Sequence, residues 1–311
     1  MHIAIIGTGA LGCLFGARLV NNANVILLGS WSRGLTAINQ RGICVDYGEK
    51  TEHVQMCAYS DPQQVAPVDI ALLLVKSWQT ERAAALAESV LGPEGLAVTL
   101  QNGLGNFEKL CDIVGSSRAV AGATTQGAVL KGPGHVCHSG GGATYFGVRS
   151  DTRERLGRLS VLFEDSGFVT VLTDNLDEII WSKLVVSTGI NAVSALLGVQ
   201  NGVLLTRPDG ADLMVAAARE TAAVAAASGI KIPFDPAEQV SSVAALTSSN
   251  ISSMLQDMRR GAPTEIKSIN CAVARKGVQL GVSVPVNLVL CKLVSAACCP
   301  DANDENRLQF A

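Results

Sequence analysis

The sequence has nine cysteines among its 311 residues but no C-x-x-C pair. So few cysteines in a chain of this length do not make a disulfide-stapled scaffold. The adjacent Cys298 and Cys299 suit neither an ordinary disulfide nor a tetrahedral zinc site. We therefore expect buried, reduced thiols, no metal site and a cytoplasmic protein.

The chain also lacks an excess of basic residues. Its 24 Lys and Arg face 27 Asp and Glu, so the net charge of −3 predicts no nucleic-acid partner. No basic segment followed by an apolar run opens the chain, and we expect no signal peptide. Residues 184–206 carry no charge, but their polar side chains include those of Ser187, Thr188, Asn191, Ser194, Gln200 and Asn201. This predicts a buried helix and no membrane partner.

Strand signals are concentrated in the first half of the chain and almost absent after Thr173. Apolar strands are expected at His2–Ile6, Asn24–Leu28 and Val68–Val75. A helix pattern, Ala10–Asn21, lies between the first two, and short β-like stretches at Ile43–Tyr47 and His53–Ala58 precede the third. Later helices are expected at 175–198, 209–228, 236–246, 249–259, 264–280 and 286–298. We predict an α/β Rossmann-type doubly wound sheet over residues 1–170, then an all-helical C-terminal domain over 171–311. The polar tail, 300–311, is expected to be loosely held.

A glycine-rich turn follows the first strand and opens the first helix pattern. Gly7, Gly9 and Gly12 fit G-x-G-x-x-G, in which the glycines allow a tight turn, close approach of a pyrophosphate, and close helix packing. The start of the helix adds unpaired N–H groups and a positive dipole end. We predict a dinucleotide-binding turn made of Gly7, Thr8, Gly9, Ala10, Leu11 and Gly12. The alternative is a chance turn in a chain with 31 glycines.

No acidic residue occurs before Asp46. NAD enzymes usually place a carboxylate at the end of the second strand, where it binds the ribose hydroxyls. Here Ser30 and Arg33 occupy that region and could bind a 2′-phosphate, which a carboxylate would repel. This pattern favours NADP(H) over NAD. The alternative is that Arg33 is only a surface cation on a loop.

The predicted helical domain has no histidine. All four histidines precede it, and His135 and His138 are interpreted as structural, so a histidine proton donor for ketone reduction is disfavoured. Lys183, Ser187 and Asn191 instead share one face of an apolar helix at spacing i, i+4, i+8. Polar groups facing an apolar interior are costly unless paired, which favours a polar cleft, and burial lowers a lysine pKa. The alternative is a solvent-facing polar stripe.

Several short motifs occur together along nearly the whole chain. They are Gly7–Gly12, Val75-Lys76-Ser77, Gln101-Asn102-Gly103, Trp181-Ser182-Lys183-Leu184 with Asn191, and Ser252–Asp257 followed by Thr264-Glu265-Ile266. In these motifs the chain resembles the 2-dehydropantoate 2-reductase, or ketopantoate reductase, family. The resemblance implies a Rossmann domain, a helical domain and an active site between them. It also implies NADPH-dependent reduction of 2-dehydropantoate to pantoate, in pantothenate and coenzyme A biosynthesis.

The resemblance also implies roles for single residues. Lys183 matches the lysine that polarises the carbonyl and protonates the alkoxide, and Glu265 matches an active-site glutamate. Asn191 matches a substrate ligand, while Ser253, with Asn250 beside it, matches the serine that receives the substrate carboxylate. Two further residues, Lys76 and Asn102, match positions near the nicotinamide side of the cofactor.

Three of these residues also have structural interpretations. Glu265 falls in the first turn of a predicted helix, where the dipole favours a carboxylate. Ser253, like Ser252, could cap a helix, and Asn102 could form a turn before Gly103.

One position departs from the family pattern. Members that act on ketopantoate often have an asparagine one turn after the lysine, where this chain has Ser187. The shorter hydroxyl leaves open a different branched or aromatic 2-keto acid as substrate. A non-catalytic NADP(H)-binding sensor is a lower alternative. The apolar helices are compatible with a homodimer as well as a monomer.

Overall fold

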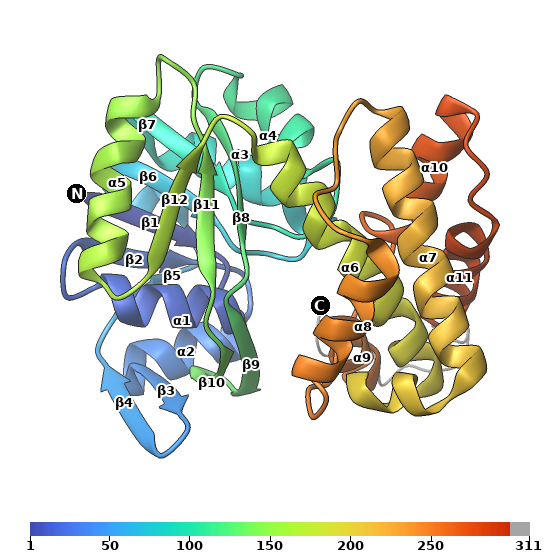
Figure 1. Ribbon diagram of the computed structural model, residues 1–311. Helices are drawn as coiled ribbons and strands as arrows, with labels where there is room; N and C mark the ends of the chain where they lie inside the picture. The colour runs from blue at the N-terminus through green and yellow to red at the C-terminus, as the bar shows by residue number, and fades with distance from the viewer. Residues whose placement is uncertain (299–311) are drawn as a thin grey trace. The chain divides into compact units, whose positions relative to one another are not determined.

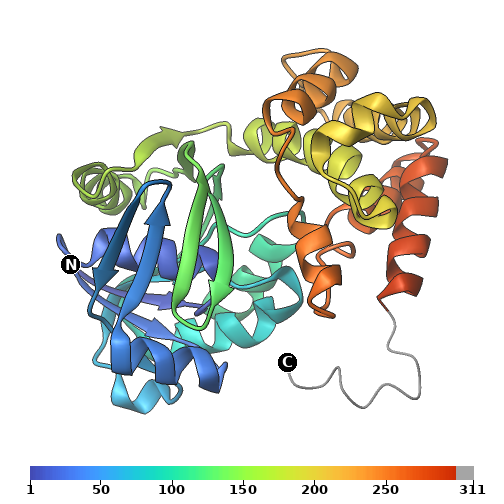
Figure 2. The ribbon, with the colours of Figure 1, turned by 90° about the horizontal axis from the view of Figure 1, so that it is seen from below.

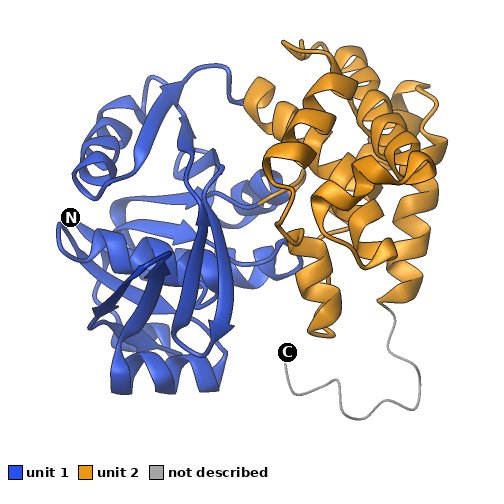
Figure 3. Cartoon of the chain, turned by 60° about the horizontal axis from the view of Figure 1, so that its bottom comes forward, with its two compact units in different colours: residues 1–101, 106–176 blue, residues 102–105, 177–311 orange. Residues whose placement is uncertain are grey.

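A computed structural model describes residues 1–298 of the chain. The chain divides into two compact units, coloured separately in Figure 3. The first contains Met1–Gln101 and Asn106–Leu176, and the second contains Asn102–Gly105 and the residues from Asp177 onward. The expectation of a loosely held tail at 300–311 concerns residues outside the described part.

The first unit is built on an eight-stranded sheet with the order β12-β11-β8-β7-β6-β1-β2-β5 (Figure 1). Its strands are β1 (His2–Ile6), β2 (Asn24–Leu28), β5 (Cys57–Tyr59), β6 (Val68–Leu73), β7 (Leu91–Thr99), β8 (Ala119–Thr124), β11 (Ala143–Gly147) and β12 (Val169–Thr173). The six neighbouring strands β8, β7, β6, β1, β2 and β5 are parallel to one another. Strand β11 runs antiparallel to β8. The predicted Rossmann-type doubly wound sheet is therefore confirmed.

Both faces of this sheet are covered by helices. Ile3 and Ile5 of β1 join a core with α1 (Ala10–Leu19), α2 (Ser32–Arg41) and α5 (Arg153–Asp165). Ala4 and Ile6 join the opposite core with α3 (Thr80–Val90) and α4 (Asn106–Val114). Burial on two faces explains why the central strands are nearly continuous apolar runs.

A smaller four-stranded sheet, with the order β4-β3-β10-β9, belongs to the same unit. Its strands are β3 (Ile43–Tyr47), β4 (Lys50–Val54), β9 (Gly127–Gly132) and β10 (His135–Gly140). Figure 2 shows the blue β3–β4 pair beside the green β9–β10 pair, although they are far apart in sequence. The fully buried Val45 and Val136 belong to the same core as α1, and alternate residues of these strands point the other way.

One helix of the first unit was not expected from the sequence. Helix α2 (Ser32–Arg41) follows soon after β2, in a region for which no helix was expected. Its mean hydropathy is low and it contains Gly34, so its local helix signal is weak. The helix is therefore stabilised mainly by tertiary packing, because Leu35 and Ile38 are buried in the core.

The second unit is helical throughout its described part. It contains α6 (Leu176–Leu197, from its second residue), α7 (Pro208–Ala227), α8 (Pro236–Leu246), α9 (Ser253–Arg259), α10 (Asn270–Leu280), α11 (Pro285–Ala297) and the short 3-10 helix η3 (Asn201–Thr206). Helix α6 lies in its core, with Trp181, Leu184 and Val185 buried. At Gly189 a Cβ would lie 2.7 Å from the carbonyl oxygen of Met214, so α6 and α7 pack closely.

Helix α6 is also the one described helix that is long and apolar enough to cross a membrane, by length and composition. Of its most apolar 18-residue window, 56% is buried inside the protein. Core helices of soluble proteins have the same character, which agrees with the predicted buried helix in this region.

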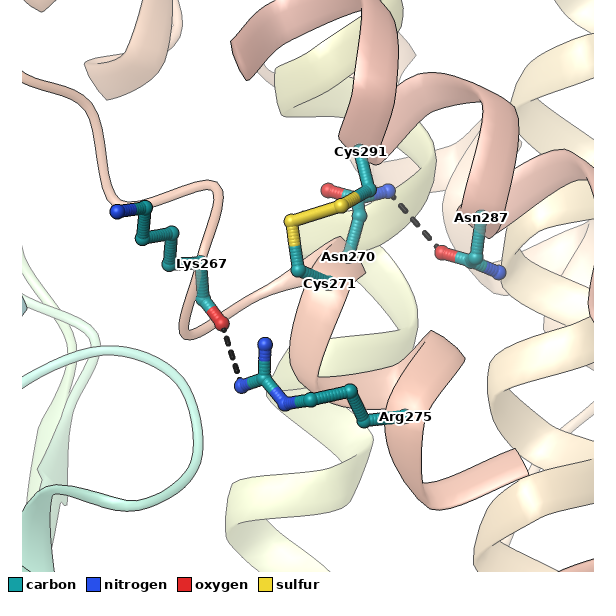
Figure 4. Close-up of a disulfide and its surroundings, with 6 residues drawn as sticks. All are labelled: Lys267, Asn270, Cys271, Arg275, Asn287 and Cys291. Carbon is teal, nitrogen blue, oxygen red and sulfur yellow. Dashed lines mark hydrogen bonds between the residues drawn. A yellow bond between two sulfur atoms is a disulfide. The ribbon is translucent and has the colours of Figure 1, made fainter. Parts of the chain in front are cut away.

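Two cysteines form a disulfide, which the sequence did not indicate. Cys271 on α10 is bonded to Cys291 on α11, next to the hydrogen bond from Asn270 Nδ2 to Asn287 Oδ1 (Figure 4). The expectation of reduced thiols is therefore wrong for this pair. The partners are 20 residues apart and meet only because the two helices pack side by side, so their spacing carries no signature. Within the described residues, Cys13, Cys44, Cys57, Cys111, Cys137 and Cys298 are free.

Candidate active site

The amine of Lys183 is held by a polar set that lies wholly within the second unit. Lys183 Nζ donates a hydrogen bond of 2.8 Å to Asn102 Oδ1. The amide of Asn102 then donates from Nδ2 to Glu265 Oε2 at 3.4 Å. Asn102 thus accepts from the cation and donates to the carboxylate, so a single amide orients both charged groups.

The Asn102–Gly105 loop is fixed to the turn that carries Glu265. Gly103 has φ +85°, and a Cβ there would overlap the carbonyl group of Ser268. The same carbonyl oxygen accepts a 2.8 Å hydrogen bond from the amide of Leu104. Only glycine combines this φ with such close backbone approach, so Gly103 brings Asn102 to Glu265. This bridging role of Asn102 was not expected, although the Asn102-Gly103 pair was visible in the sequence.

Burial changes the acidity of Lys183. Loss of hydration lowers the pKa of its amine from 10.5 to about 8, and the charge of Glu265 opposes this shift. An ammonium with a pKa near 8 is still mostly protonated at pH 7, yet it releases a proton far more readily than a surface lysine. This is the property that a general acid needs at neutral pH.

Glu265 does not lie in the first turn of a helix, contrary to expectation. Helix α10 begins at Asn270, and Glu265 precedes it in a series of turns. Its carbonyl oxygen accepts from the amides of Ser268 and Ile269, which closes this turn. The helix-dipole explanation for a carboxylate here therefore fails. Glu265 is 4% exposed as a residue, and its carboxylate accepts from Asn102, the partner of Lys183.

The predicted polar face of α6 is present. Lys183, Ser187 and Asn191 are all half-buried, whereas Leu184, Val185 and Thr188 between them are buried. One turn further, Ser194 Oγ donates to Ser252 Oγ at 2.8 Å, which joins α6 to the start of α9. Of the predicted substrate residues, Asn250 precedes Ser252 by two positions and Ser253 follows it directly.

Ser252, by contrast, has a structural role. Its hydroxyl caps α9 by accepting from the amide of Leu255 at 3.3 Å. The capping interpretation offered for both serines thus holds for Ser252, while Ser253 is the first residue of the helix.

In the first unit, the glycine turn between β1 and α1 has the geometry of a phosphate cradle. Gly7 has φ +124°, and a Cβ on Gly12 would overlap the carbonyl oxygen of Gly7. A Cβ on Gly9 would meet nothing within 4 Å, so the space above the turn is open. Gly9 is the N-cap of α1, and the first turn of that helix, which begins with Ala10 and Leu11, has no acidic residue. The turn therefore fits the pyrophosphate of a dinucleotide.

The residues proposed for the 2′-phosphate lie at the end of β2. Ser30 and Arg33 are both exposed, and Arg33 is in the first turn of α2 rather than on a loop. Thr8 is buried, and a Cβ on Gly29 would lie 2.9 Å from its side chain. Thr8 therefore packs between the glycine turn and the end of β2.

Lys76 follows β6 at the carboxyl edge of the sheet, in a loop held by polar contacts that had not been expected. Gln101 Nε2 donates to Val75 O at 3.1 Å and to Thr80 Oγ1 at 2.9 Å. The Thr80 hydroxyl also lies 2.8 Å from Ser77 O and 2.9 Å from Asn106 Oδ1, and its one hydrogen is donated to either of these acceptors. Gln101 follows β7 and contacts the segment after β6. The sequence offered no sign of these contacts except that Gln101 comes directly after an apolar run.

The family to which the chain belongs follows from comparison with known proteins. Residues 3–151 match the model of "Ketopantoate reductase PanE/ApbA", and residues 175–297 match that of its C-terminal domain. The chain belongs to the ketopantoate reductase family. The resemblance identified from the motifs is thereby confirmed.

Relatives of this ketopantoate reductase family member match it over almost their whole length. The 2-dehydropantoate 2-reductase of Halobacterium salinarum is 36% identical over 96% of this chain and 99% of its own. That of Pyrococcus horikoshii is 33% identical over 95% and 97%. These named relatives make the chain a member of a family of oxidoreductases that act on CH–OH groups.

Solved structures agree on the fold. A ketopantoate reductase from Ralstonia eutropha is 32% identical, with a TM-score of 0.88 over 96% of this chain and 98% of its own. D-mandelate dehydrogenase, solved with NADH and anilino(oxo)acetate, is 26% identical, with a TM-score of 0.90 over the same shares. The fold is thus common to reductases named for different substrates.

The charge at residue 102 should control the acidity of Lys183. In Asn102→Asp, a carboxylate would replace the neutral oxygen that accepts from Nζ, so the pKa of Lys183 should rise from about 8 toward 10.5. Asn102→Ala is the uncharged control and should not raise it. NMR titration of the lysine Nζ or Cε resonance measures both. An equal pKa of Lys183 in Asn102→Asp and in the unaltered protein would show that the side chain at residue 102 does not act on the amine.

Proposed function

We propose that the chain reduces 2-dehydropantoate to pantoate with NADPH. The observation that carries the proposal is the desolvated Lys183, hydrogen-bonded through Asn102 to Glu265, in a chain similar over 96% of its length to a named 2-dehydropantoate 2-reductase. Under this proposal the first domain, taken as residues 1–170, binds the dinucleotide. The second, residues 171–311, supplies the acid and the substrate ligands.

Reduction of a ketone requires a hydride at carbon and a proton at oxygen. When bound, the dihydronicotinamide supplies the hydride. Lys183 donates the proton: one N–H bond breaks, an O–H bond forms on the former carbonyl oxygen, and a neutral amine remains. Water returns the proton before the next turnover. Before transfer, the ammonium also polarises the carbonyl by donating a hydrogen bond to its oxygen.

Asn102 and Glu265 make Lys183 an effective donor. The Asn102 side chain restrains the amine through its 2.8 Å hydrogen bond, which reduces the freedom of a long side chain. The negative charge of Glu265 stabilises the ammonium and opposes the effect of burial. The two effects together keep the amine protonated at neutral pH without making it too weak an acid.

The substrate carboxylate and hydroxyl groups need polar partners near this amine. Asn191 and Ser187 lie on the same face of α6 as Lys183, and Asn250 and Ser253 lie where α9 is joined to α6. In the proposal Ser253 receives the carboxylate and Asn191 binds an oxygen of the substrate. The half-buried character of Ser187 and Asn191 supports such a role, because polar groups there are accessible but partly dehydrated.

The cofactor proposal rests on the turn Gly7–Gly12 and on the end of β2. The open space above Gly9 supports pyrophosphate binding, and Lys76 is proposed to lie on the nicotinamide side, with Asn102 near it. NADP(H) is preferred because Arg33 is exposed at the start of α2 and no carboxylate precedes Asp46.

A second candidate substrate class is another branched or aromatic 2-keto acid. Two observations favour it: Ser187 is shorter than asparagine, and D-mandelate dehydrogenase has the same fold with a TM-score of 0.90. A panel assay of NADPH oxidation separates the two candidates. We expect the highest kcat/KM with 2-dehydropantoate, whereas a higher value with an aromatic 2-keto acid would transfer the assignment. Absence of turnover with every 2-keto acid, despite NADPH binding, would favour a non-catalytic sensor.

Removing the amine should affect turnover more than cofactor binding. Lys183→Met should lower kcat by about 10²–10⁴-fold, the usual contribution of a general acid, with the Kd for NADPH nearly unchanged. In the unaltered enzyme kcat should fall as pH rises through about 8, since only the protonated amine donates. Steady-state kinetics and a binding titration measure these values. A Lys183→Met enzyme with normal kcat would exclude the amine as the acid.

Arg33 should discriminate between the two dinucleotides. Arg33→Ala should raise KM for NADPH by about tenfold, because an exposed charge-assisted hydrogen bond to phosphate is lost, and leave KM for NADH unchanged. The matched control is Arg41→Ala, which removes an exposed arginine from the other end of α2. Equal effects of Arg33→Ala on both cofactors would contradict the assignment of the 2′-phosphate site.

A further inference from the structure

The four-stranded sheet of the first unit collects four side chains of the kinds that bind transition metals. Cys44 on β3 is paired with His53 on antiparallel β4 and with His135 on parallel β10. Side chains of directly paired residues lie on the same face of a sheet, and so do residues two apart on one strand. The thiol of Cys44, two imidazoles and the carboxylate of Asp46 therefore share one face.

This face is the one that does not join the core. Val45, between Cys44 and Asp46, is fully buried, as is Val136, which follows His135. Cys44 and Asp46 are half-buried, His53 is exposed, and the His135 side chain is 42% exposed. An ion in solution can therefore reach the four side chains without any change in the core.

Three of the four side chains already bring their ligand atoms near one another, and the fourth, His53, contacts Cys44. His135 Nε2 is 2.7 Å from Asp46 Oδ2, and Cys44 Sγ is 3.8 Å from His53 Nε2. One ligand atom from each of Cys44, Asp46 and His135 lies within 4.8 Å of the other two. Zinc bonds of about 2.0–2.3 Å would separate tetrahedral ligand atoms by roughly 3.3–3.8 Å. His53 lies outside the group of three, so its side chain has to turn toward them to complete a tetrahedral set.

An ion pair accounts for only half of this cluster. Asp46 accepts from Thr51 Oγ1 at 2.8 Å and also contacts His135. The ion pair leaves unexplained why a thiol and a second imidazole occupy the adjoining positions.

We infer that Cys44, Asp46, His53 and His135 bind one zinc ion. One sulfur, two nitrogens and one oxygen suit Zn²⁺, whereas Mg²⁺ and Ca²⁺ prefer oxygen ligands alone. Binding releases the proton of the Cys44 thiol and breaks the direct contact between Asp46 and His135, as each turns toward the metal. The ion would join the β3–β4 hairpin to β10. This differs from the expectation of no metal site, and none of the four residues belongs to the proposed reductase site.

The test uses the full-length protein, stripped with a chelator and titrated with Co²⁺ and then Zn²⁺. We expect one Co²⁺ per chain, a thiolate-to-cobalt charge-transfer band, tetrahedral ligand-field bands, and displacement by Zn²⁺. Cys44→Ser should abolish the charge-transfer band. His135→Ala and His53→Ala should each weaken Zn²⁺ binding by about tenfold or more, since even loss of an outer-shell partner costs that much.

The matched controls are Cys57→Ser and His2→Ala, which remove another exposed thiol and another exposed imidazole from the same unit. Both should bind Co²⁺ and Zn²⁺ as the unaltered protein does. Circular dichroism and NADPH turnover show whether each variant is folded. Should Cys44→Ser be unfolded, loss of affinity in folded Asp46→Asn carries the same test. The inference is overturned by absence of the charge-transfer band, by a band that survives Cys44→Ser, or by full affinity in folded Asp46→Asn.

Discussion

The proposed chemistry depends on keeping an ammonium group on an apolar helix without neutralising it. Burial alone disfavours the charged form of Lys183, and an isolated lysine there would lose its proton or turn toward water. The Asn102 amide and the Glu265 carboxylate prevent this, since one accepts from the amine and the other contributes opposite charge. The glycine at 103 and the turn at 264–269 serve this arrangement, because they bring the two partners to the lysine.

Much of the fold could be predicted from the sequence because its signals are local. The strand β1 is followed at once by a glycine turn and an apolar helix, and the period of the apolar residues changes after Thr173. The stripe formed by Lys183, Ser187 and Asn191 was also predictable, because helix geometry brings residues four apart onto one face. These features depend on neighbours within one or two turns.

Other features depended on tertiary contacts and could not be predicted. Helix α2 has a weak local pattern and is stabilised by Leu35 and Ile38 in the core. Glu265 falls in turns because α10 starts later than its apolar pattern suggested. The Cys271–Cys291 bond joins packed helices, and the cluster around Cys44 is assembled by strand pairing between residues up to 91 positions apart. Spacing along the chain reveals neither.

The division of the chain at Gln101 and Asn102 connects the two halves of the proposed mechanism. Gln101 belongs to the first unit, where its side chain holds the loops at the carboxyl ends of β6 and β7. Asn102 is the next residue, yet it belongs to the second unit, where its side chain accepts a hydrogen bond from Lys183. The proposed proton donor, Lys183, and the two groups proposed to tune it, Asn102 and Glu265, therefore all belong to one unit. A single peptide bond links them to the sheet edge where open α/β folds bind their cofactors.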